Sequence, residues 1–163
     1  MKIGVVSDTH SRPLPRQLIE EFAKVDLIIH AGDFCDLADV KQWVGLKPFK
    51  AVHGNMDVAA VTRQFPRRQI IEAEEVKIGL FHGEGARQGL RERVANEFKG
   101  DPVNVVIFGH SHEACNESVD GVLYFNPGSP NDDVFAPYCS YGILEVSGGT
   151  VKGKIIKVKK ANG

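Results

Sequence analysis

The chain has 163 residues, which is the length of one domain and enough to bury most of its apolar surface. Its residues are 42% hydrophobic and 25% charged, as in ordinary globular proteins, which excludes the disordered and fibrous classes. A formal net charge of -1 gives no general attraction to nucleic acid or to an anionic membrane, so neither is an expected partner. We expect one domain over residues 1–163.

No targeting or membrane segment is expected. No apolar run approaches the roughly 18 residues that a membrane-spanning helix needs. The N-terminal "MKIGVVSDTH" lacks the apolar region and cleavage site of a signal peptide. The three cysteines are odd in number and have no CxxC spacing, which argues against a disulfide framework and against a thiolate zinc site. We therefore expect a cytoplasmic protein with reduced cysteines.

Short apolar runs rich in β-branched residues alternate with segments of helical periodicity along the chain. The runs predict strands over residues 3–6, 27–29, 50–53, 78–81 and 103–108. Helices are predicted over residues 14–24, 37–45 and 87–99. Further on, the pattern predicts a strand over 122–125 after a turn, and a hairpin that pairs 138–146 with 151–158. This alternation predicts an α/β fold with a largely parallel sheet covered on both faces, followed by antiparallel strands.

A side chain that can bind metal follows each of the first five predicted strands. In chain order these candidates are Asp8, His10, Asp33, Asn55, His82, His110 and His112. Because parallel strands end at the same edge of a sheet, we expect these side chains to meet there. Oxygen and imidazole donors without thiolate suit Mn²⁺, Fe²⁺, Co²⁺, Ni²⁺ or Zn²⁺. Seven donors are too many for one four-coordinate ion, so the sequence predicts two ions that share a carboxylate.

Some neighbouring residues allow two interpretations. Arg12 is either a contact for a substrate phosphate or a solvated loop arginine. The stretch "RQFPRR" (63–68) is a phosphate-gripping lid or, as we favour, an exposed loop. His30 and His53 follow or end strands, where packing is the more common role, although His53 could also be a proton donor. Asp57 is expected to orient a ligand or to form part of a turn rather than to bind metal.

The ordered motifs of the chain resemble those of the calcineurin-like metallophosphoesterases. The matching stretches are "DTH" (8–10), "GD" (32–33), "GNMD" (54–57), "HG" (82–83) and "GHSH" (109–112). The later "FNPGS" (125–129) resembles the small bacterial and archaeal phosphodiesterase branch of this family. The resemblance implies an α/β sandwich of two mixed β-sheets flanked by helices. It also implies a dinuclear metal site on the loops at the C-terminal ends of the strands.

The resemblance further implies how the candidate ligands are divided between two ions. The first ion would be held by Asp8, His10, Asp33 and His112. The second would be held by Asp33, Asn55, His82 and His110. Asp33 would bridge the ions, of which Mn²⁺ is the first expectation, with Ni²⁺, Fe²⁺, Co²⁺, Zn²⁺ or Mg²⁺ as the other choices. A hydroxide between the ions would attack a small phosphodiester substrate, with Asp8, Asp33, Asn55 and His110 as the catalytic residues.

One position departs from the family pattern. Many members have a histidine after the asparagine of the third motif, where it assists the leaving group, but this chain has Met56. A thioether cannot donate a proton, so the resemblance implies a phosphodiesterase that lacks this general acid. The alternative is a protein-interaction scaffold that retains the phosphoesterase fold; a nuclease is disfavoured by the neutral charge. Relatives often form dimers or larger assemblies, so a second copy of the chain is also an expected partner.

Overall fold

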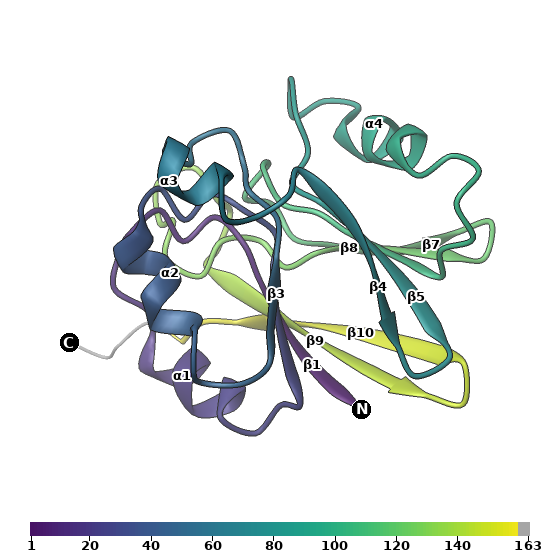
Figure 1. Cartoon of the computed structure of the whole chain (residues 1–163), viewed down its shortest axis with the longest axis horizontal. Helices are drawn as coiled ribbons and strands as arrows, with labels where there is room; N and C mark the ends of the chain where they lie inside the picture. The colour runs from purple at the N-terminus through teal and green to yellow at the C-terminus, as the bar shows by residue number, and fades with distance from the viewer. Residues whose placement is uncertain (160–163) are drawn as a thin grey trace.

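The computed structural model describes residues 1–159, which form two five-stranded β-sheets packed against each other (Figure 1). Residues 160–163 of the expected domain lie outside the described residues. Helices α1, α2 and α3 lie on the side of the first sheet, and α4 lies on the side of the second (Figure 1). No helix within residues 1–159 is long and apolar enough to cross a membrane.

The first sheet contains an antiparallel pair of strands at one edge, followed by three parallel strands. Its strands, in order across the sheet, are β10 (Thr150–Lys157), β9 (Ser140–Ser147), β1 (Lys2–Val6), β2 (Leu27–His30) and β3 (Phe49–Ala51). Strands β1, β2 and β3 are parallel, whereas β9 runs antiparallel to both of its neighbours. The crossovers between the parallel strands contain α1 (Arg16–Phe22) and α2 (Leu37–Trp43).

The second sheet has a parallel centre with an antiparallel strand at each edge. Its order is β4 (Arg68–Ala73), β5 (Val76–Phe81), β6 (Val105–Ile107), β8 (Val122–Asn126) and β7 (Cys115–Val119). Strands β5, β6 and β8 are parallel. Helix α4 (Leu90–Glu97) connects β5 to β6, and the short α3 (Ala59–Thr62) precedes β4.

The main core lies between the two sheets. Alternate side chains of β1, such as Ile3 and Val5, pack in one cluster with Ile78 and Leu80 of β5. A second cluster lies under α1 and α2 and includes Trp43, which is fully buried. A third cluster joins α4 to the outer face of the second sheet. Apolar burial on both faces of the parallel strands holds their carboxyl ends in fixed positions along one edge.

The structure confirms the sandwich of two mixed sheets but not a single parallel sheet covered by helices on both faces. Each sheet has one face against the other sheet, so helices cover only the outer faces. Two edge strands, β4 and β7, were not predicted, because neither contains a continuous run of buried apolar residues. In "RQFPRR", Arg63 directly follows the last residue of α3 and Arg68 begins β4, so the predicted loop is limited to the residues between them.

Candidate metal centre

The loops that follow β1, β2, β5 and β6 meet at one edge of the sandwich. Two main-chain hydrogen bonds join the first two loops, from Asp8 N to Gly32 O at 3.0 Å and from His10 N to Asp33 O at 3.0 Å. A similar main-chain hydrogen bond, accepted by the carbonyl oxygen of His82, joins the loops that follow β5 and β6. These bonds fix loops that are far apart in sequence as one unit, which positions the side chains that they carry.

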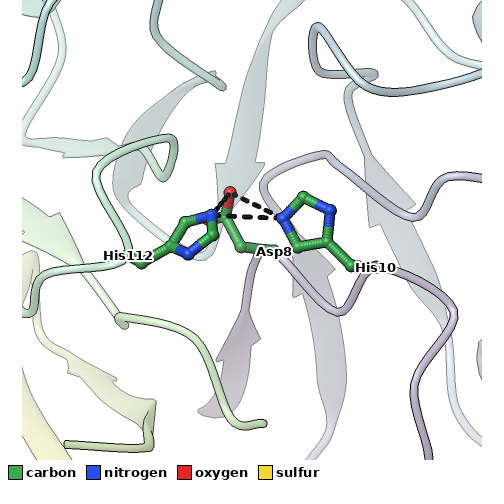
Figure 2. Close-up of side chains that lie close together, drawn as sticks. All are labelled: Asp8, His10 and His112. Atoms are coloured by element: carbon green, nitrogen blue, oxygen red, sulfur yellow. Dashed lines mark hydrogen bonds and ion pairs between the residues drawn. The ribbon is translucent and has the colours of Figure 1, made fainter. Parts of the chain in front are cut away.

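Asp8, His10 and His112 form one group of potential ligands (Figure 2). The Nε2 atoms of His10 and His112 face each other at 3.1 Å. Asp8 Oδ1 lies 3.2 Å from His112 Nε2 and 3.8 Å from His10 Nε2. One ion could therefore contact two imidazoles and a carboxylate at this point.

Asp8, Asp33 and His82 form a second, fully buried group. His82 Nε2 lies 3.3 Å from Asp33 Oδ2 and 3.9 Å from Asp8 Oδ1. Asp33 Oδ2 is also 3.8 Å from His10 Nε2, so this oxygen lies between the two groups. Both carboxylates are thus close to both groups, and the bridging role of Asp33 stays a prediction.

The ring orientations of His82 and His112 suit metal binding. His82 Nδ1 lies 2.7 Å from the carbonyl oxygen of Ala31, and His112 Nδ1 lies 2.5 Å from Asp132 Oδ2. A carbonyl and a carboxylate can only accept hydrogen bonds, so each Nδ1 donates its proton. When the ring is neutral, Nε2 is then the nitrogen with a free lone pair, and in both residues it points into the cluster.

The carboxylates are held by main-chain donors. Asp8 Oδ2 accepts a hydrogen bond from His110 N at 3.1 Å, and Asp33 Oδ1 accepts one from Met56 N at 2.8 Å. In each case the second oxygen is the one that faces the histidines. Asp57 accepts from the main chain of the Asp33 loop at 3.1 Å, which is the orienting role predicted for it. The main chain thereby aims one oxygen of each aspartate at the cluster.

Two atoms in the cluster are buried without a hydrogen-bond partner. Among the described residues, these atoms are Asp8 Oδ1 and His82 Nε2. An unsatisfied buried polar atom costs about 1–3 kcal/mol, and native structures contain few of them. A divalent cation bound between these atoms would satisfy both, so the residues present fit the metal that the sequence predicts.

The charges of the cluster also fit a cation. Burial opposes ionisation of Asp8, but the positive charges of His82 and His112 outweigh it and keep the pKa of Asp8 below its ordinary value. Burial alone would lower the pKa of His82, whereas Asp8 and Asp33 raise it to about 9. Without metal, a protonated His82 balances the charge of the carboxylates through space, although its Nε2 forms no hydrogen bond with them. Metal binding would displace this proton and take over its role in balancing charge.

Five of the candidate ligands have a backbone conformation that is unfavourable for residues other than glycine. Their positive φ angles are 57° for Asp8, 49° for His10, 60° for Asp33, 69° for His110 and 59° for His112. This region costs roughly 1–2 kcal/mol per residue. Strain of this kind concentrates at functional sites, where the surrounding structure maintains it.

Gly54 and Gly109 allow the close approach of these loops. A Cβ atom on Gly54 would collide with the carboxylate of Asp33, and one on Gly109 would collide with Ser7 Oγ and Asp8 Oδ2. Neither glycine has a positive φ, so glycine is needed because a side chain would not fit and not because of the backbone conformation. Close packing against the candidate ligands therefore accounts for glycine at these two positions of the motifs.

The structure brings together five of the seven candidates and places Asn55 and His110 beside them. His110 Nδ1 is 2.9 Å from Asn55 Oδ1, and His110 Nε2 is 2.7 Å from the carbonyl oxygen of Gly85. The rings of His110 and His82 are 5.4 Å apart between centroids, so His110 borders the second group. For His110 and Asn55 to bind an ion, these hydrogen bonds must first exchange for coordination.

Two supporting residues were not predicted as such. Asp132 holds His112, and it lies in a loop after "FNPGS" where no strand ending marks it. Asp39 of α2 is fully buried and accepts from Ser11 N at 3.1 Å in the loop that carries His10. His30 is the packed residue that the sequence favours, since it is buried and stacked on Phe34. No sequence signal separates Asp39 from an ordinary polar helix residue.

Two cavities flank the cluster. One has a volume of about 110 Å³ and is lined by Asn55, His82 and Arg67, among others. The other has a volume of about 250 Å³ and includes His10 and His112 in its lining. Each cavity therefore includes candidate ligands from a different side of the cluster.

A family model described as the calcineurin-like phosphoesterase superfamily domain matches residues 1–149. The chain belongs to this superfamily. A probable metallophosphoesterase from Methanocaldococcus jannaschii is 38% identical over 135 residues, which are 80% of this chain and 68% of that protein. The predicted family is thus confirmed.

Two solved structures have the same fold as this chain. The structure of an archaeal phosphodiesterase superposes with a TM-score of 0.78 at 29% identity, covering 96% of this chain and all of that chain. Vps29 from Entamoeba histolytica, in complex with Zn²⁺, superposes with a TM-score of 0.77 over 98% of this chain and all of that chain. At 23% identity, the likeness to Vps29 shows the fold alone.

Proposed function

We propose that the protein is a metal-dependent phosphodiesterase with two divalent ions. The observation that carries the proposal is that three imidazoles and two carboxylates form two adjoining groups, in which the buried atoms Asp8 Oδ1 and His82 Nε2 lack hydrogen-bond partners. Membership of the phosphoesterase superfamily supports the hydrolysis of phosphoester bonds. The nitrogen and oxygen donors suit Mn²⁺, which we propose as the first ion to test.

When bound, two such ions neutralise charge on the phosphoryl oxygens and lower the pKa of a shared water. The protein supplies fixed ligand positions, because main-chain N–H groups hold Asp8 and Asp33 and a carboxylate holds His112. Rigid positioning means that little reorganisation is needed during the reaction. Phosphoryl transfer depends mainly on positioning and electrostatics, so a nucleophilic serine or cysteine is unnecessary.

A diester is the favoured substrate because the cluster is flanked by two cavities. A phosphodiester has an organic substituent on each side of its phosphorus, and each substituent could enter one cavity. The smaller cavity is bordered by the Arg67 guanidinium, which lies 4.5 Å from the centre of the Phe81 ring. Arg67 is also paired with Glu97 at 2.8 Å, which leaves it less free to grip a phosphate.

The leaving group receives no proton from Met56. This side chain is 57% exposed next to the cluster, and its main-chain N–H holds Asp33. His53, the other residue considered for this role, lines the smaller cavity and has its Nδ1 3.4 Å from the carbonyl oxygen of Gly54. General acid catalysis is worth on the order of 10² to 10⁴ in rate, so esters with acidic leaving groups should be the best substrates.

The decisive assay uses metal-stripped protein with added Mn²⁺, Ni²⁺ or Mg²⁺. We expect metal-stimulated hydrolysis of bis(4-nitrophenyl) phosphate and slower hydrolysis of the monoester 4-nitrophenyl phosphate. Asp33→Asn should abolish the activity, because the variant loses a charge that lies 3.3 Å from His82 and 3.8 Å from His10. Full activity in this variant, or faster hydrolysis of the monoester, would refute the proposal.

The alternative is a protein-interaction scaffold on the same fold. The likeness to Vps29, at 23% identity, shows the shared fold alone. The scaffold alternative predicts no metal-stimulated hydrolysis of either ester and full binding of a partner by Asp33→Asn. A cytoplasmic location and self-association also stay predictions, and gel filtration combined with light scattering tests the second.

A further inference from the structure

A cavity of about 250 Å³ opens beside the first group of candidate ligands. Its lining is formed by His10, Arg12, His112, Asp132 and Phe135. Engineered protein cavities of about 150 Å³ bind benzene, so this volume is sufficient for a six-membered aromatic ring. Because two candidate metal ligands line the cavity, a group bound there would be adjacent to a phosphoryl group at the metal centre.

One wall of the cavity is joined by hydrogen bonds to the loops that carry the candidate metal ligands. Ser129 Oγ donates to the carbonyl oxygen of Asp8 at 2.8 Å. Asp132 uses Oδ2 to hold His112 at 2.5 Å and Oδ1 to accept from Phe135 N at 3.0 Å. A single carboxylate therefore positions a candidate metal ligand and the backbone of the aromatic residue in the wall.

The aromatic residue in this wall, Phe135, is 67% exposed. It belongs to none of the three clusters of buried apolar residues. Its neighbour Val134 is 68% exposed but does not line the cavity. The ring of Phe135 is thus available to pack against an aromatic group, in an offset-stacked or edge-to-face geometry.

The cavity also contains a cation without an acidic partner. Arg12 Nη1 donates to the carbonyl oxygen of Asn131 at 3.2 Å, and Asn131 Nδ2 donates to the carbonyl oxygen of Thr9 at 3.0 Å. Within residues 1–159, no carboxylate forms an ion pair with Arg12. The guanidinium is therefore oriented by the loop, and its charge is available to an anion.

From these observations we propose that the cavity binds an aryl substituent of the substrate against Phe135, while Arg12 contacts a phosphoryl oxygen. This inference rests on the proposed phosphodiesterase function. It resolves the two interpretations of Arg12 in favour of a phosphate contact. It also gives a binding reason for aryl substrates that is independent of how acidic their leaving groups are.

The test compares the binding of phenylphosphonate and methylphosphonate, which have no ester bond to hydrolyse. Isothermal titration calorimetry on the Mn²⁺-loaded wild type should show phenylphosphonate binding about two- to tenfold more tightly, the usual contribution of an aromatic pair. Phe135→Ala should reduce the ratio of the two affinities to about one. Val134→Ala is the matched control and should retain the wild-type ratio. Arg12→Gln should weaken both ligands by a similar factor, because both present the same anionic group.

Equal affinities for the two phosphonates in the wild type would overturn the proposal, as would a phenyl preference that persists in Phe135→Ala. A loss of affinity in Arg12→Gln that is confined to phenylphosphonate would overturn the phosphate contact. The same wild-type preparation is assayed for Mn²⁺-dependent hydrolysis of bis(4-nitrophenyl) phosphate. Hydrolysis without a phenyl preference refutes the aryl cavity alone. A phenyl preference without hydrolysis refutes the phosphodiesterase function and supports the cavity as a binding site.

Discussion

Replacing Asp132 by asparagine should weaken the binding of one metal ion and spare the other. Asp132 Oδ2 lies 2.5 Å from His112 Nδ1, on the opposite side of the ring from the candidate metal-binding nitrogen. Burial opposes ionisation of Asp132, but hydrogen bonds from His112 and from the main chain at Phe135 and Val134 lower its pKa to about 2. The residue is therefore a carboxylate at neutral pH, and Asp132→Asn removes the charge while preserving the shape.

The size of the effect follows from this one contact. A charge-assisted hydrogen bond is about twice as strong as a neutral one, and it makes the ring a stronger donor to metal. Loss of such a supporting group typically costs 10- to 100-fold in metal affinity, which is about 1.4–2.7 kcal/mol. His82 is supported separately by the carbonyl oxygen of Ala31, so an ion bound at His82 should be unaffected.

The assay is a titration of metal-stripped protein with Mn²⁺, followed by calorimetry and fitted to two sites. We expect one dissociation constant to rise 10- to 100-fold and the other to change by less than about twofold. Asp133→Asn is the control, because Asp133 is exposed and its side chain makes no hydrogen bond or ion pair with the described residues. Two unchanged dissociation constants in Asp132→Asn, or equal losses in both variants, would refute the reasoning.

Three further changes test other parts of the structure. Met56→His should raise the turnover of diesters with poor leaving groups relative to aryl diesters, since it restores a proton donor; unchanged relative rates across a leaving-group series would contradict this. Burial, and then the charge of His82, keep the pKa of His30 well below 6.5, so the folded state does not take up the proton that the unfolded state binds. The free energy of unfolding therefore decreases as the pH is lowered below about 6.5. The stability advantage of the metal-free wild type over His30→Gln should then shrink by up to about 1.4 kcal/mol per pH unit, and a constant difference in denaturant titrations would disprove this. Gly109→Ala should lower the free energy of unfolding by about 1–3 kcal/mol and weaken metal binding, because the added Cβ would collide with Ser7 and Asp8. Wild-type values for both quantities would contradict this.

The sequence predicts the central strands because both of their faces are buried. The first strand, "KIGVV", has four buried residues out of five, and the second, "LIIH", is buried throughout, so both give continuous apolar runs. Strand β7, "CNESV", has no buried residue and gives no such run. Short edge strands of this kind form through main-chain pairing with a neighbour, which a single sequence does not reveal.

The candidate ligands could be predicted because they follow buried strands that end at one edge. Five of them converge as expected, but the hydrogen bond between Asn55 and His110 depends on the arrangement of separate loops. Asp132 could not be predicted, since it is 20 residues from His112 and no periodic pattern connects them. The positions of ligands at strand ends follow from the order of strands and helices, which the periodicity of the sequence predicts. The positions of supporting residues follow from the three-dimensional packing of loops, which it does not predict.

The central claim is that the strand-end cluster binds two divalent ions, and counting the bound metal tests it most directly. Metal-stripped protein is saturated with Mn²⁺, freed of excess ion by gel filtration and analysed by inductively coupled plasma mass spectrometry against protein concentration. We predict two ions per chain in the wild type and fewer than one in Asp8→Asn, because Asp8 belongs to both groups of ligands. A wild type that binds one ion or none, or an Asp8→Asn variant that retains two, would contradict the account.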